Sequence, residues 1–173
     1  RVANGSNVIN TLINAIKNGK KVTAVVELQA RFDEENNIYW ANKLSEEGAT
    51  VIYGVPGLKV HSKLLLISRR EKNKLVHYAH VGTGNFNEKT AKIYSDISLL
   101  TFDKRITGEV QRLFRFYHDN LKPGAYTHCI VSPFDMRGKF TKLINKEIEN
   151  ASKGLPAYII IKLNNLVDTA MIE

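Results

Sequence analysis

The amino-acid sequence predicts an α/β fold, with a mixed sheet flanked by helices and then the start of a second, similar domain. Two patterns support this prediction. In the first third of the chain, helical apolar stripes alternate with short β-branched runs, which is typical of parallel strand–helix–strand units. Beyond residue 60, two strand-like runs flank a short polar segment, which indicates an antiparallel hairpin. A sheet with both strand directions accounts for both patterns.

The N-terminal third predicts a helix, a strand, a second helix and a second strand. Residues 7–18 have apolar side chains at helical spacing, and Gly19 follows as a stop signal. Residues 22–28 are β-branched and apolar, as expected of a strand buried on both faces. Asp33 can cap a helix that runs to about residue 47, and residues 50–53 resemble a second strand. This order and spacing predict a right-handed parallel crossover.

The remaining elements predict a hairpin, a third helix and a domain boundary. Residues 64–68 and 75–81 form the hairpin strands, residues 94–101 a further strand, and residues 107–117 a helix. Lys-Pro-Gly at 122–124 breaks the chain, so we expect a first domain over 1–125 and a second over 126–173. The second contains a helix at 136–152, a strand at 157–163 and a helix that starts near residue 166. That strand has nothing to pair with and the chain begins at Arg1, so we expect an excerpt of a longer protein.

Composition restricts the classes of protein to consider. Apolar residues make up 43% of the chain, enough for a hydrophobic core. A single cysteine, Cys129, excludes a disulfide framework and favours an intracellular, reducing compartment. The longest apolar runs are far shorter than the roughly 20 residues of a membrane span, so we expect no transmembrane segment.

The net charge of +8 is concentrated in one part of the chain. Residues 54–92 contain eight lysines and arginines against two glutamates, so 8 minus 2, or +6, falls there. Such a segment makes polyanions reasonable partners. The cations of the hairpin turn are interpreted as a solvated tip; these are Arg69, Arg70, Lys72 and Lys74.

The residues with chemistry lie at 56–63, in the sequence Pro-Gly-Leu-Lys-Val-His-Ser-Lys. If this segment is a strand, then Lys59, His61 and Lys63 share one face, because side chains alternate with period two. Buried cations need partners, and a phosphate group would supply them. Imidazole is a competent nucleophile near neutral pH, and neighbouring lysines favour its neutral form.

A glycine-rich turn after the second hairpin strand supports a phosphate site. Its sequence at 82–85 is Gly-Thr-Gly-Asn. Gly82 and Gly84 would let backbone N–H groups approach an anion, and Asn85 adds a side-chain donor. The His-x-Lys pattern alone occurs by chance in many proteins, so the hypothesis depends on the two segments together.

The two segments together resemble a known family. His-x-Lys followed by a glycine-rich turn and Asn is similar to half of a phospholipase D-type site, in which two such halves face each other. The longer stretches at 26–35, 56–63, 80–87 and 162–168 are similar to those of bacterial polyphosphate kinase of type 1. This resemblance covers nearly the whole chain and implies a phospholipase D-like fold.

The resemblance implies a reversible transfer of the ATP γ-phosphate to inorganic polyphosphate, with Mg²⁺, through a phosphohistidine at His61. It implies that Tyr94 contacts the nucleotide, and it places Arg1 and Arg31 among magnesium-associated residues. A guanidinium cannot ligate Mg²⁺, so both arginines are expected to bind phosphate oxygens of the Mg-nucleotide. The resemblance also implies a homo-oligomer, with no nucleic acid required, in the cytoplasm with or without peripheral membrane association.

Two other functions stay open from the residues alone. The wider phospholipase D pattern has an Asp five residues after the lysine, where this chain has Ser68, which counts against a phosphodiesterase. A non-catalytic module that binds polyanions by charge is the other alternative. The resemblance implies that the opposing half-site lies beyond Glu173, so the isolated chain is expected to be inactive or impaired.

Overall fold

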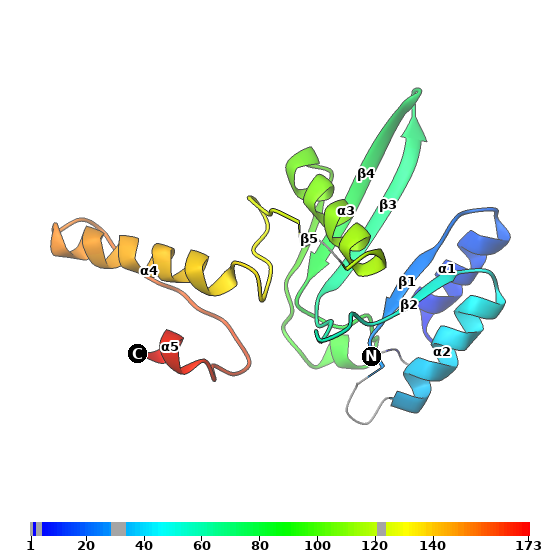
Figure 1. Cartoon of the computed structure of the whole chain (residues 1–173), viewed down its shortest axis with the longest axis horizontal. Helices are drawn as coiled ribbons and strands as arrows, with labels where there is room; N and C mark the ends of the chain where they lie inside the picture. The colour runs from blue at the N-terminus through cyan, green and yellow to red at the C-terminus, as the bar shows by residue number, and fades with distance from the viewer. Residues whose placement is uncertain (1, 3–4, 29–33, 121–123) are drawn as a thin grey trace. The chain divides into compact units, whose positions relative to one another are not determined.

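The computed structural model describes residues 2, 5–28, 34–120 and 124–173. It divides into two compact units, residues 1–124 and residues 125–173, each described by itself (Figure 1). Four features expected from the sequence fall outside the described residues: Arg1, Arg31, the Asp33 cap and the break at 122–123.

Two helices and two parallel strands form the first part of unit 1. Helices α1 (Asn7–Lys17) and α2 (Glu34–Glu46) accompany strands β1 (Thr23–Val26) and β2 (Thr50–Tyr53). α1 begins after Ser6, whose hydroxyl accepts a hydrogen bond from the backbone of Ile9. It is followed by Gly19, which has a φ of 71°. The buried core of this part consists of Ile9, Ile13, Leu44 and Ala49.

The parallel pairing of the first two strands is confirmed, but β1 is shorter than expected. The sequence predicted a strand over 22–28 that is buried on both faces. β1 instead covers four residues and is at most half-buried. It pairs only with β2 in the described sheet, and its first residue, Thr23, is exposed.

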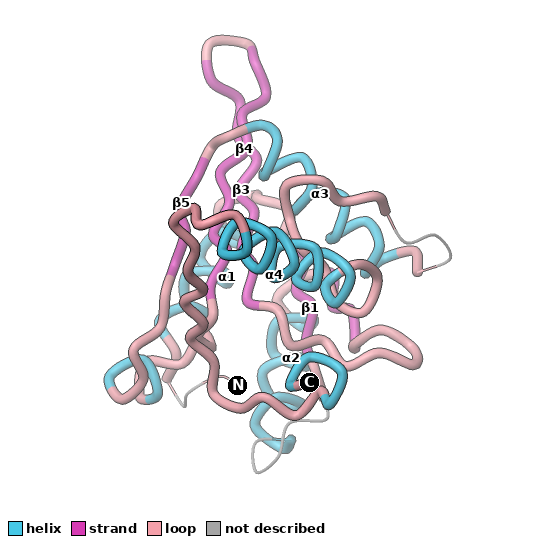
Figure 2. Tube along the Cα trace, turned by 90° about the vertical axis from the view of Figure 1, so that its left-hand side faces the viewer, coloured by secondary structure: helices cyan, strands magenta, loops and turns pink. Residues whose placement is uncertain are grey.

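A second, antiparallel sheet contains the predicted hairpin. β3 (Lys63–Glu71) pairs with β4 (Lys74–Gly82) over nine residue pairs, and β5 (Ser98–Thr101) pairs with the last four residues of β4. The connecting turn is the two residues Lys72 and Asn73, with φ values of 45° and 63°. This tight turn makes both strands longer than predicted, and the hairpin extends past β5 (Figure 2).

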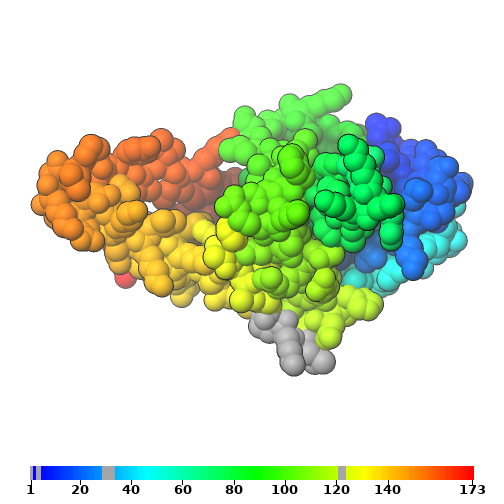
Figure 3. Space-filling model, turned by 90° about the horizontal axis from the view of Figure 1, so that it is seen from above, coloured from blue at the N-terminus to red at the C-terminus, as the bar shows by residue number. Residues whose placement is uncertain are grey.

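Helix α3 (Lys104–His118) covers one face of this sheet. Its buried residues include Val110, Leu113 and Phe116, and Ala79 of β4 is also buried. Figure 3 shows α3 beside the hairpin at the surface of the unit. The predicted helix over 107–117 is confirmed and starts three residues earlier, after the N-cap Asp103.

Two strand predictions near the candidate site are wrong. Residues 59–62 lie outside any strand, because β3 begins at Lys63. Of the strand expected at 94–101, only residues 98–101 pair with β4. The 3₁₀ helix η1 (Thr90–Lys92) precedes it, and the backbone N–H of Tyr94 donates to the carbonyl of Thr90, which closes a turn instead of extending a strand.

Unit 2 contains α4 (Met136–Ser152), at the predicted bounds, and the short α5 (Thr169–Ile172). An Arg137–Asp168 ion pair connects α4 to the N-cap residue of α5. The strand expected at 157–163 does not form, since the described residues of this unit offer no second strand to pair with it. In the part of the chain that the structure describes, every helix is too short or too polar to traverse a bilayer.

Candidate functional site

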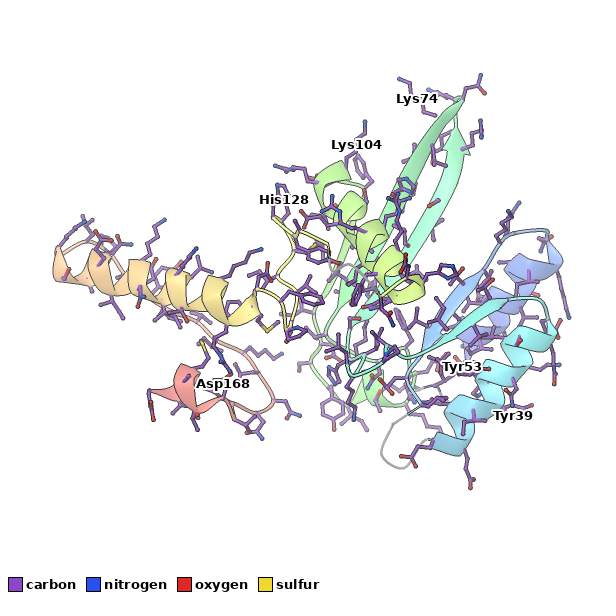
Figure 4. The ribbon with its side chains drawn as sticks, viewed as in Figure 1. Tyr39, Tyr53, Lys74, Lys104, His128 and Asp168 are labelled. Carbon is purple, nitrogen blue, oxygen red and sulfur yellow. The ribbon has the colours of Figure 1, made fainter. Side chains whose placement is uncertain are left out.

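His61 and Lys63 are in contact, although the strand expected to align them is absent. The Lys63 Nζ atom lies 3.1 Å from His61 Nδ1 and 3.3 Å from His61 Nε2, and it also donates to the His61 backbone carbonyl. Lys63 is the first residue of β3, opposite Gly82 at the base of the hairpin. In Figure 4, the labelled Lys74 marks the opposite end, at the hairpin tip.

The surroundings of His61 lower the pKa of its imidazole. Partial burial is the largest cause, followed by the positive charges of Lys63 and then Lys59. A lowered pKa extends the neutral form of the ring to lower pH. A neutral ring has one nitrogen lone pair available for nucleophilic attack.

Lys63 is a buried cation, with only 8% of its surface exposed. Burial lowers the pKa of its ammonium, and the negative charge of Asp96 opposes this by raising it. The carboxylate of Asp96 thus helps the buried lysine to stay charged beside the histidine.

The glycine-rich turn makes room for two polar side chains. A Cβ on Gly84 would lie 2.2 Å from Asp96 Oδ2, and a Cβ on Gly82 would lie 2.6 Å from His80 Cε1. Neither glycine has a positive φ, so close packing, rather than left-handed backbone, explains both. Because Asp96 occupies one side of Gly84, an anion would have to approach this turn from another side.

Thr83 connects the turn to the segment that follows η1. Its hydroxyl donates to Asp96 Oδ1 at 2.9 Å and accepts from the Ile97 backbone N–H at 3.0 Å. Its own backbone N–H donates to the Ile97 carbonyl at 3.1 Å. These bonds fix the Asp96 carboxylate next to the turn.

For the other expected site residues that the structure describes, it shows exposure and position in the chain but no direct contact with His61. Lys59 is exposed in the segment before His61 and contributes through its charge. Asn85 is half-buried directly after Gly84. Tyr94 lies beyond η1 with 63% of its surface exposed. Arg1 and Arg31 lie outside the described residues.

Reasoning from the sequence missed three residues of this site, Asp96, Glu27 and Tyr117. Glu27 Oε2 accepts a hydrogen bond from the Val60 backbone N–H at 2.8 Å, and the Tyr117 hydroxyl lies 2.7 Å from Ser62 Oγ. Glu27 falls in the 26–35 segment, whose resemblance was noted, and Asp96 lies two residues after Tyr94; these positions were the available signal. Nothing in the sequence distinguished Tyr117 from the other aromatic residues of its helix.

The donor set does not fit a resident metal ion. Among the described residues, no group of three or more histidine, cysteine, aspartate or glutamate side chains could hold one.

His80 has a structural environment. Its Nε2 lies 3.0 Å from Ser98 Oγ, and its ring packs against Phe86 with a centroid distance of 5.4 Å. Ser68, where phospholipase D-type sequences have an aspartate, bonds instead to His77 Nδ1 at 2.7 Å.

The two parts of the chain match two family models. Residues 1–123 match polyphosphate kinase C-terminal domain 1, and residues 129–173 match polyphosphate kinase C-terminal domain 2. The chain is 54% identical over 173 residues to a polyphosphate kinase of Escherichia coli strain K12 and 55% identical to that of Salmonella typhimurium. It spans about a quarter of the length of these relatives, 25% in each case.

A solved structure is also similar. The crystal structure of polyphosphate kinase from Porphyromonas gingivalis matches with a TM-score of 0.82 and 40% sequence identity. The match covers 99% of this chain and 29% of that one. It confirms the predicted fold class, a phospholipase D-like mixed α/β arrangement.

Proposed function

Because the chain belongs to the polyphosphate kinase family, we propose that it forms the part of an ATP:polyphosphate phosphotransferase in which His61 carries the phosphoryl group. One observation supports this most strongly. A buried lysine ammonium lies 3.1 Å and 3.3 Å from the two ring nitrogens of a histidine whose pKa is lowered. A neutral nucleophile beside a fixed positive charge suits attack on a phosphoryl group.

The proposed reaction has two reversible steps. In the first, the lone pair of one His61 ring nitrogen attacks the γ-phosphorus of ATP. A P–N bond forms, the bond from that phosphorus to the β–γ bridging oxygen breaks, and ADP leaves. In the second step a terminal oxygen of polyphosphate attacks the same phosphorus. The P–N bond breaks and the chain gains one phosphate, while the electron pair returns to His61.

The neighbouring residues have supporting roles in this proposal. Lys63 stabilises negative charge on the transferred group, and Lys59 adds positive charge from the exposed side. Asn85 contributes a donor at the glycine-rich turn. Gly82 and Gly84 shape that turn for phosphate binding, on the side that Asp96 does not occupy.

The remaining roles depend on the resemblance of the segments. Tyr94 would contact the nucleotide, a role its exposure permits. Arg1 and Arg31 would bind phosphate oxygens of the Mg-nucleotide, so that Mg²⁺ is supplied with ATP.

The organisation of the protein is likewise a proposal. We place a first C-terminal catalytic domain at 1–125 and the beginning of a second at 126–173. The enzyme would be a cytoplasmic homo-oligomer that uses ATP or ADP and inorganic polyphosphate and requires no nucleic acid.

Labelling with γ-³²P-ATP tests the function in a full-length protein that carries this chain. We expect label on the wild-type protein that is acid-labile and base-stable, and no label on His61→Ala. An unlabelled wild-type protein that still binds ATP would refute the covalent mechanism. Cleavage of a phosphodiester without ATP would then favour a phosphodiesterase, whereas salt-sensitive polyphosphate binding that survives His61→Ala would favour a polyanion-binding module.

A further inference from the structure

The segment that presents His61 has little regular structure of its own. Residues 59–62 lie between an isolated bridge, Val55 to Leu58, and the first residue of β3. They therefore lack the ladder of backbone hydrogen bonds that would fix a residue within a sheet. A nucleophile needs a defined position, because a misplacement of about 1 Å can cost about 10²-fold in rate. Contacts from other elements must therefore hold this segment in place.

The first anchor comes from the end of β1. Glu27 directly follows β1, and its Oε2 accepts the Val60 backbone N–H at 2.8 Å, one residue before His61. The Glu27 backbone carbonyl in turn accepts from the Asn37 side chain at 3.0 Å. Asn37 is 2% exposed within α2, so this anchor is itself tied to the interior of the first α/β layer.

The second anchor comes from α3, on the other side of the histidine. The Tyr117 hydroxyl lies 2.7 Å from Ser62 Oγ, one residue after His61. The Tyr117 ring packs against Phe114 and Phe116, with centroid distances of 5.9 Å and 6.3 Å. Phe116 is buried, so this anchor too is fixed in a packed element.

We propose that Glu27 and Tyr117 are positioning residues for His61. Two elements far apart in the sequence each hold one flanking residue, and together they replace the missing strand pairing. Neither residue needs to touch the phosphoryl group, because each acts through Val60 or Ser62. The inference rests on the proposed function of His61.

A pair of substitutions at Glu27 separates its hydrogen bond from its charge. Glu27→Ala removes both, whereas Glu27→Gln keeps an oxygen that can accept the Val60 N–H and removes only the charge. In single-turnover labelling of the full-length protein with γ-³²P-ATP, we expect Glu27→Ala to slow phosphorylation of His61 by about 10-fold or more. We expect Glu27→Gln to stay within about 3-fold of wild type, because its side-chain oxygen still accepts the Val60 N–H.

A double-mutant cycle tests the second anchor. Tyr117→Phe and Ser62→Ala should each slow labelling by about 3-fold to 10-fold, and the double variant should be no slower than the slower single one. Tyr78→Phe is the matched control. Its hydroxyl also makes a hydrogen bond, to Glu71 Oε1 at 2.8 Å, but near the hairpin tip, so its labelling rate should stay at the wild-type value. ATP affinity should be unchanged in all these variants.

The outcomes separate this inference from the proposed function. Glu27→Gln as slow as Glu27→Ala would overturn the first anchor, since the acceptor atom would then be irrelevant. Additive effects of Tyr117→Phe and Ser62→Ala would overturn the second. If Glu27→Ala fails to fold, a Glu27→Gln variant that labels about 10-fold more slowly than wild type would still overturn the first anchor, and the Ser62 cycle decides the second. Wild-type protein without label refutes the function itself, whereas wild-type and variant proteins labelled at equal rates refute only the positioning.

Discussion

Replacing Lys63 by methionine should change both the rate and the pH dependence of His61 phosphorylation. Methionine approximates the length of the lysine stem but removes the ammonium that lies 3.1 Å from His61 Nδ1. Because the charge of Lys63 lowers the pKa of His61, its loss should raise that pKa toward the ordinary value for histidine. More of the imidazole is then protonated at slightly acidic pH, so the acidic limb of the rate profile should move to higher pH.

The expected loss of rate at the optimum pH follows from the geometry. Lys63 is a buried, preorganised donor that directly contacts the nucleophile. Removal of one such donor from an enzyme site typically costs about 10²-fold to 10³-fold in kcat. We therefore expect Lys63→Met to reduce the single-turnover labelling rate by at least about 10²-fold. The rate would be measured by quenched flow at pH values from about 5 to about 9.

Lys59→Met is the matched control for this prediction. Lys59 is exposed, and its charge is a smaller cause of the lowered His61 pKa than that of Lys63. Its loss should shift the acidic limb in the same direction by a smaller amount and reduce the rate less. If Lys63→Met keeps both the wild-type rate and the wild-type acidic limb, then the contact between Lys63 and His61 has no catalytic meaning and the reasoning is refuted.

Three further predictions concern the surroundings of the site. Gly84→Ala places a methyl group 2.2 Å from Asp96 Oδ2 and should destabilise the protein by about 1–3 kcal/mol. Gly108→Ala in α3 meets nothing within 4 Å and should stabilise the protein by about 0.5–1 kcal/mol. The midpoints of thermal unfolding of the two variants should therefore shift in opposite directions from that of wild type. Asp96→Asn removes the charge that raises the pKa of Lys63, so the alkaline limb of the labelling rate should move to lower pH; an unchanged limb would show that Lys63 does not depend on Asp96. Glu88→Ala removes the carboxylate that accepts from the Asn7 backbone N–H at 2.8 Å and should cost about 1 kcal/mol in denaturant unfolding at pH 7. Hydrogen bonds, first from its own backbone N–H and then from Asn7 and Ser6, lower the folded-state pKa of Glu88. The stabilisation that Glu88 provides is therefore present above its unfolded-state pKa and is lost as the pH falls through its folded-state pKa. A stability difference between wild type and Glu88→Ala that persists in strong acid would contradict this.

Elements with a strong local signal could be predicted from the sequence. α4 was predicted at its observed bounds, 136–152, because the limits of a long helix are set by local sequence. The hairpin was also predicted from local sequence, because two strand-like runs flank a short polar segment. Its turn was misjudged, since Lys72 and Asn73 both adopt left-handed backbone, which a lysine seldom does.

Pairing between distant strands was harder to predict. The period-two argument for Lys59, His61 and Lys63 assumed a strand where residues 59–62 have none. The two functional side chains meet nonetheless, because the Lys63 side chain turns back toward His61. Hydrogen bonds such as Glu27 to Val60 join residues 33 positions apart and leave no periodic pattern. Such contacts depend on tertiary structure, so local sequence could not reveal them.

The antiparallel sheet has three strands at the base of the hairpin and two at its tip, and this difference affects local unfolding. β4 has neighbours on both sides only at residues 79–82, which include the partner of Lys63, whereas the outer residues 74–78 pair with β3 alone. Backbone amides should therefore exchange with deuterium progressively faster from the base of the hairpin to its tip, since a two-stranded ribbon is only marginally stable. The tip can then open and close without loosening Lys63. A peptide inserted between Lys72 and Asn73 should be tolerated, whereas the same insertion beside Gly82 should disrupt the end of the ladder that holds the site.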